Sequence, residues 1–186
     1  MTAQISDTFL FQEQKFSLVG VNGGNLFHPA AFGMQPLPRM TSCWRGFVCT
    51  YKTLENALFL DTLQINLGQE GPQINHLRPV FSNAGTFDNI YQDLNLQIDF
   101  TGGMLVADGF IRELYVHMGF HPAWKYETVF ELVFSHGTLL ETKDVSERMA
   151  ELRKEMTQKP LQPGTGMPRK KLEEWIASTF KRSNRP

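Results

Sequence analysis

Apolar and polar residues alternate along most of the chain, and this alternation predicts antiparallel strands. In the N-terminal third, two apolar runs over residues 9–11 and 15–21 are joined by three polar residues. Runs spaced in this way are typical of a hairpin. The glycine-rich stretch 21–25 that follows is expected to be a turn, because glycine adopts the positive φ angles that turns require.

A second strand pair is expected over residues 42–53 and 57–67, with the turn at Glu55-Asn56. Within 57–67 the alternation slips near Asp61, which indicates a β-bulge or a break in the strand.

The clearest alternation of the chain lies over residues 94–100, where apolar side chains occupy every second position. One face of this segment is therefore expected to be buried and the other solvated. Asp108-Gly109 has the composition of a two-residue hairpin turn between the apolar runs on either side of it. Residues 124–134 alternate again, and His136-Gly137 is expected to turn them into a last strand over 138–143.

Helices are expected only after the last strand. Asp144 with Glu147 resembles a capping box at a helix start. The apolar residues that follow recur at helical spacing and form one stripe: Val145, Met149, Leu152 and Met156. Residues 159–167 have the composition of a linker, and a second helix is expected over 168–182, packed on the same domain.

Residues 68–91 show no sustained period and contain several glycines and prolines. We expect a long loop between two halves of the chain. Loops of this length are more often functional or mobile than simple connectors.

The tetrapeptide Phe-His-Pro-Ala occurs twice, at residues 27–30 and 120–123. Each copy lies between two expected hairpins, so the chain could consist of two pseudo-repeats over about 8–67 and 92–143. A chance coincidence of four residues is the competing explanation.

With or without a repeat, the predicted fold class is α+β and mostly antiparallel β. We expect a curled sandwich or partly closed barrel of about eight or nine strands built from hairpins, with two C-terminal helices.

Length and composition predict one folded domain, over about residues 1–158 with its first helix. The chain has 186 residues, of which 41% are hydrophobic and 20% charged, values that are typical of globular proteins. The formal net charge of −1 gives no electrostatic reason to expect nucleic acid or an anionic membrane as a partner.

The chain start lacks the basic and apolar regions of a secretory signal, and no apolar run is long enough to span a bilayer. Cys43 and Cys49 lie on one expected strand, roughly 20 Å apart, too far for a disulfide. Two reduced, buried cysteines favour a cytoplasmic location.

His117 and His121 have the spacing that would chelate zinc on a helix. Gly119 and the proline at 122 disfavour a helix here, and on a strand the two rings would lie roughly 13 Å apart. Neither a metal nor another cofactor is therefore expected.

The best binding candidates are Trp44 and Arg45, together with the group Trp124, Lys125 and Tyr126. Tryptophan and arginine are enriched where proteins recognise partners, and arginine can hold a carboxylate through two hydrogen bonds. The competing interpretation is a core tryptophan beside a surface arginine.

His28 and His121 are the histidines of the two Phe-His-Pro-Ala copies. Both precede proline and are expected to have an extended backbone. If the halves pack about a twofold axis, the two rings could share a site; otherwise each bonds a backbone carbonyl in a structural corner.

Three functional hypotheses follow. The leading one is a non-catalytic binding protein that holds a small-molecule ligand or another protein on an aromatic-rich sheet, since no catalytic motif is present. The second is an enzyme whose site at the junction of the halves uses His28, His121 and Arg45. The third is a regulatory or inhibitory protein that acts on its partner through the 68–91 loop.

Overall fold

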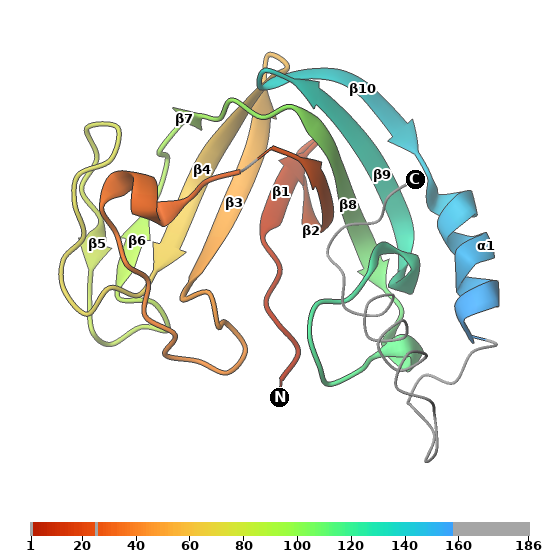
Figure 1. The fold of residues 1–186 in the computed structure, drawn as a ribbon, viewed down its shortest axis with the longest axis horizontal. Coiled ribbons are helices and arrows are strands. Elements are labelled where there is room, and N and C mark those ends of the chain that lie inside the picture. Colours follow the sequence, from red (N-terminus) through yellow and green to blue (C-terminus); the bar gives the residue numbers. More distant parts are fainter. Residues whose placement is uncertain (1, 25, 158–186) are drawn as a thin grey trace.

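The computed structural model describes residues 2–24 and 26–157. Ten strands make up most of the regular secondary structure (Figure 1). They are β1 (Thr8–Phe11), β2 (Gln14–Gly23), β3 (Phe47–Leu54), β4 (Ala57–Ile65), β5 (Val80–Phe81), β6 (Asn89–Tyr91), β7 (Leu96–Gln97), β8 (Gly102–Phe110), β9 (Tyr126–Ser135) and β10 (Thr138–Asp144). The helices are the short 3-10 helices η1 (Pro29–Phe32), η2 (Arg112–Leu114) and η3 (Ala123–Lys125), and the α-helix α1 (Ser146–Thr157).

Seven of the strands form a ring of hydrogen-bonded neighbours, in the order β10-β9-β8-β2-β1-β3-β4. The ring closes where Thr138 of β10 lies opposite Ala57 of β4, and the Leu58 amide donates to the Gly137 carbonyl over 2.8 Å. Figure 1 shows β10 crossing one end of the ring to reach the β3–β4 turn. The pairings are antiparallel except for β1 with β3, which run parallel.

The outer edge of β4 is shared by three strands in succession. Ala57 pairs with β10, residues 59–60 with β7, and residues 63–65 with β6. Strand β5 then pairs with β6 and ends the sheet. The predicted mostly antiparallel sheet is thus confirmed, with ten strands in place of eight or nine.

Only one α-helix lies in the described residues, so the prediction of two C-terminal helices is not confirmed. The linker 159–167 and the helix predicted over 168–182 lie outside the described residues. Helix α1 begins where predicted: the Ser146 amide donates to Asp144 Oδ1 over 2.9 Å. Its apolar stripe packs against the outer face of the sheet.

Three predicted hairpin turns are confirmed by their backbone angles, and in the last of them His136 and Gly137 have φ of 46° and 74°. Gln12 and Glu13 have φ of 50° and 63°, and Glu55 and Asn56 have 50° and 64°. Such paired positive angles match the twist of the flanking strands. The bulge is confirmed too, because Thr50 pairs with Thr62 and Tyr51 with Leu60, which leaves Asp61 as the extra residue.

Three local predictions are wrong. Asp108-Gly109 is no hairpin turn, because β8 runs through it and pairs with β9 on both sides. Residues 94–100 show the predicted alternation of burial, yet only Leu96–Gln97 is a strand. The segment 42–53 is a strand only from Phe47, so Trp44 and Arg45 lie in the turns before it.

The sheet buries side chains on both faces. Aromatic rings fill the inside of the ring, where Phe134 lies 6.4 Å from Phe9 and 6.0 Å from Phe100, between ring centroids. On the outer face, α1 and η3 cover Leu105 and Val129. The inside of the ring is thus a packed core, and the candidate sites lie outside it.

Both Phe-His-Pro-Ala copies lead into a 3-10 helix, η1 for the first and η3 for the second. His28 has the extended backbone that its proline predicts, with φ −126° and ψ 111°. Two strands precede each copy in its predicted unit, but β1 and β2 pair with each other as a hairpin, whereas β7 pairs with β4 and β8 pairs with β2 and β9. This difference gives the proposed internal repeat no support.

Candidate functional site

Three of the six predicted site residues come together at one place, the loop that joins β8 to β9. Phe110 at the end of β8 pairs with Tyr126 at the start of β9, and the Ile111 amide donates to the Lys125 carbonyl over 2.9 Å. The chain between them therefore returns to its starting point. The side chains gathered here are called the cationic–aromatic cluster: Phe110, Tyr115, His121, Trp124, Lys125 and Tyr126.

His121 lies between two aromatic rings. Its ring centroid is 4.7 Å from that of Phe110 and 5.2 Å from that of Tyr115. Both imidazole nitrogens are buried, and neither has a hydrogen-bond partner within the described residues. Burial, and then the positive charge of Lys125, lower the pKa of His121 to about 4. The ring is therefore neutral at neutral pH.

Lys125 is almost completely buried, with 1% of its surface exposed. Its Nζ lies 5.3 Å from the Trp124 ring centroid, and no carboxylate of the described chain forms an ion pair with it. Burial lowers the pKa of this amine to about 8. A buried lysine without a counter-charge is uncommon, because removing an ammonium ion from water is unfavourable by several kcal/mol.

Trp124 is the second side chain of the cluster with an unsatisfied buried nitrogen. Its indole Nε1 is buried and has no acceptor in the described part of the chain. The backbone around it is fixed, because Arg153 of α1 donates from Nε to the Trp124 carbonyl over 2.8 Å and also bonds the Tyr126 carbonyl.

All three side chains can donate hydrogen bonds. An indole and an ammonium can only donate hydrogen bonds, and a neutral imidazole donates from one nitrogen. Each buried donor without a partner is unfavourable by about 1 to 3 kcal/mol. The buried nitrogens of His121 and Trp124 therefore lack partners and Lys125 lacks a counter-charge, and a bound acid could supply both.

Arg45 already holds a carboxylate of its own chain. Its Nη1 and Nη2 donate to the two carboxylate oxygens of Asp7, over 3.1 and 2.6 Å. Asp7 also accepts from the Cys49 amide over 2.9 Å. The guanidinium lies 4.8 Å from the Phe47 ring centroid and 5.9 Å from that of Phe120. These contacts give Arg45 a structural role that ties the N-terminal segment to β3.

The other two predicted residues stand apart from the cluster. Trp44 is 56% exposed, and its backbone amide donates to Gln4 Oε1 over 3.1 Å. His28 is exposed before η1. No described contact joins His28 to His121, so the structure does not bring the two repeat histidines together.

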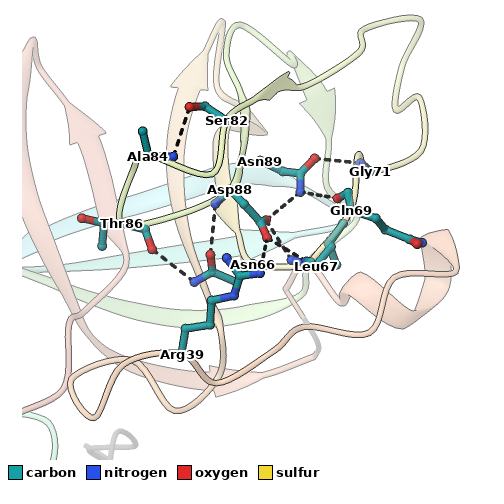
Figure 2. A network of polar contacts seen from close by, with 11 residues as sticks. Arg39, Asn66, Leu67, Gln69, Gly71, Ser82, Ala84, Thr86, Asp88 and Asn89 are labelled. Atoms are coloured by element: carbon teal, nitrogen blue, oxygen red, sulfur yellow. Dashed lines mark hydrogen bonds and ion pairs between the residues drawn. The ribbon is translucent and has the colours of Figure 1, made fainter.

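Sequence reasoning missed a second polar group, centred on Asp88 in the predicted 68–91 loop (Figure 2). This buried carboxylate accepts hydrogen bonds from the amides of Leu67 and Gly68, over 2.9 and 2.7 Å, and pairs with Arg39 at 3.1 Å. Burial alone would raise the pKa of Asp88, but these donors, with Asn89, lower it overall. Unlike the cluster, this network is fully satisfied, which indicates a structural role.

Cys43 and Cys49 are buried and form no disulfide within the described residues, as predicted. Across the described chain, no three His, Cys, Asp or Glu side chains gather as a metal site would require, and no helix combines the length and apolar character needed to cross a membrane. His117 bonds Tyr115, with 2.9 Å between Nδ1 and the phenol oxygen.

No known family model, curated protein or solved structure matches this chain.

Proposed function

We propose that the chain is a non-catalytic binding protein that holds a small acidic ligand with a flat apolar body at the cationic–aromatic cluster. One observation carries this proposal: the ring nitrogens of His121 and Trp124 are buried without a hydrogen-bond partner among the described residues, and the neighbouring buried Lys125 has no carboxylate partner there. A ligand carboxylate would give Lys125 a counter-charge and accept from its neighbours.

The rings of the cluster suit the body of such a ligand. Phe110 and Tyr126 lie edge to face, 5.2 Å apart, and leave an aromatic surface beside His121. Aromatic groups contribute about 0.5 to 1.5 kcal/mol per stacked pair beyond their burial. Tyr115 is 51% exposed and covers His121, so a change of its side-chain rotamer would open the way for the ligand.

The enzyme hypothesis has weaker support. It requires His28, His121 and Arg45 to share a site, whereas His28 is exposed elsewhere and Arg45 is bound to Asp7. A protein partner at the exposed Trp44, or through the 68–91 loop, stays an open alternative without a specific contact in its favour.

The test is an NMR titration of the full chain with phenylacetate, monitored at the Trp124 indole N–H. We expect a saturable shift there and at the amides of residues 121–126. Lys125→Met should weaken binding at least about tenfold, the equivalent of one charge-assisted hydrogen bond. Trp124→Phe, which keeps the ring and removes the donor, should weaken binding by a smaller factor and also assigns the indole signal.

Lys143→Met on β10 is the matched control, because Lys143 is an exposed lysine far along the sequence from the cluster. It should bind phenylacetate as the wild type does, and the uncharged 2-phenylethanol should bind more weakly. If no saturable shift occurs at the Trp124 indole, or if Lys125→Met binds equally well, the proposal is wrong.

A further inference from the structure

A separate cavity lies between residues 33–37, after η1, and residues 67–72, after β4. Its volume is about 300 Å³, at the lower end of the range of small-molecule sites. Met34 and Leu67 give it apolar surface, while Gln35, Gln69 and Glu70 supply polar groups. No residue of the cationic–aromatic cluster lines it.

The wall made by residues 67–72 is fixed by the Asp88 network (Figure 2). Asp88 accepts from the amides of Leu67 and Gly68. Asn89 donates to the Gln69 carbonyl over 2.9 Å and accepts from the Gly71 amide over 2.7 Å. The backbone of this wall is therefore held in place without a ligand.

Contacts behind the lining residues fix both walls as well. The phenol of the buried Tyr91 donates to the Pro72 carbonyl over 2.7 Å. A Cβ on Gly71 would lie 2.3 Å from the same phenol oxygen, so the close approach requires glycine. On the other side, the Leu37 amide donates to the Asn66 carbonyl over 2.8 Å. Such preorganisation reduces the entropy lost on binding.

The charge of the cavity is negative. Glu70 is the one charged side chain among its described lining residues. Behind the wall, Arg39 and Asp88 form an ion pair and offset each other. The charge of Glu70 also acts on Tyr91 behind the wall, because burial and then this charge raise the pKa of Tyr91 to about 12.

We infer that this cavity binds a small organic cation, a primary amine with an apolar body. The ammonium would pair with Glu70 and donate to the side-chain oxygens of Gln35 and Gln69, and the body would rest on Met34 and Leu67. The site is independent of the proposed function, because its residues and the charge of its ligand both differ.

The experiment is an NMR titration of the full chain with phenethylamine. We expect saturable shifts at the amides of residues 33–37 and 67–72. Glu70→Gln should weaken binding by about fivefold, the usual upper limit for an exposed ion pair. Glu70 is exposed, so this variant is expected to fold. Glu141→Gln, at an exposed glutamate of β10, should bind as the wild type does.

Three outcomes would overturn the inference. They are the absence of saturable shifts in the two wall segments, equal affinity of Glu70→Gln, and equal affinity for 2-phenylethanol, which lacks the charge. Since phenylacetate reports on the cationic–aromatic cluster, failure with phenethylamine leaves the proposed function untouched, and the reverse also holds.

Discussion

Lys125 and His121 are buried bases that have no carboxylate partner in the described residues, so folding makes both harder to protonate. Each therefore makes stability depend on pH, because the unfolded chain binds a proton that the folded chain has released. For His121 the affected window is pH 4 to 6.5, where stability falls as the pH falls. For Lys125 it is pH 8 to 10.5, where stability rises with pH.

Replacement of Lys125 by methionine is expected to raise the free energy of unfolding at pH 7 by up to about 3 kcal/mol, since one pKa unit corresponds to about 1.4 kcal/mol. The rise in stability between pH 8 and 10.5 should be absent from this variant. Urea denaturation from pH 7 to 10 measures both effects, with Lys143→Met as the control. A variant less stable than the wild type at pH 7 would contradict this account.

Some site residues could be identified from the sequence, but the burial of the charged ones could not. His121 was identified through the repeated tetrapeptide, and Trp124, Lys125 and Tyr126 as an aromatic group that includes a cation. The burial of Lys125 and the network around Asp88 were missed, since charged side chains are almost never fully buried and their patterns predict a surface. Their burial depends on contacts with distant parts of the chain.

At the scale of elements, the alternation pattern predicts burial better than it predicts pairing. Leu94, Ile98 and Phe100 are buried as expected, yet their segment crosses the end of the ring with isolated hydrogen bonds, such as that from the Ile98 amide to the Leu58 carbonyl. At Gly109 a favourable turn composition is overridden, because pairing with β9 continues to Phe110. Tertiary contacts decided both cases.

The segment between β4 and β6 depends on one carboxylate. Asp88→Asn should lower the free energy of unfolding by about 2 to 4 kcal/mol, because the amide turns an acceptor into a donor facing the Leu67 and Gly68 amides. Urea denaturation gives the loss, and hydrogen exchange should speed up at these two amides. Asp93→Asn, at an exposed aspartate of the same region, should change little. Equal effects of the two variants would refute the structural role of Asp88.

At the scale of the whole molecule, the hairpins followed from local signals but the ring did not. Strand β1 lies between β2 and β3 and runs parallel to β3, a pairing that no local pattern encodes. The contact of β4 with β10 likewise joins segments that are remote in sequence. Hydrophobic periodicity shows which face of a strand is buried and leaves its distant neighbours undetermined.

Closure of the ring can be weakened at Gly137, whose carbonyl accepts from the Leu58 amide. Its φ is +74°, and an added Cβ would lie 2.4 Å from the Ile98 carbonyl oxygen. Gly33 has a similar φ of +70° and open space around it. Gly33→Ala should therefore be destabilising by about 1 kcal/mol, and Gly137→Ala by at least about 2 kcal/mol more. Urea denaturation compares the variants, and equal losses would show that closure does not depend on this turn.

Several strands of the ring pair with strands that lie far along the sequence, so they are synthesised well before their partners. Strands β1 to β4 can pair as they emerge, whereas β2 must wait for β8, and the outer edge of β4 must wait for β6, β7 and β10. During that interval the edges of β2 and β4 present unpaired N–H and C=O groups, which other chains can bind. The nascent chain is therefore most open to misassociation while residues 66–110 are being made, and a pause in translation there prolongs its need for a chaperone.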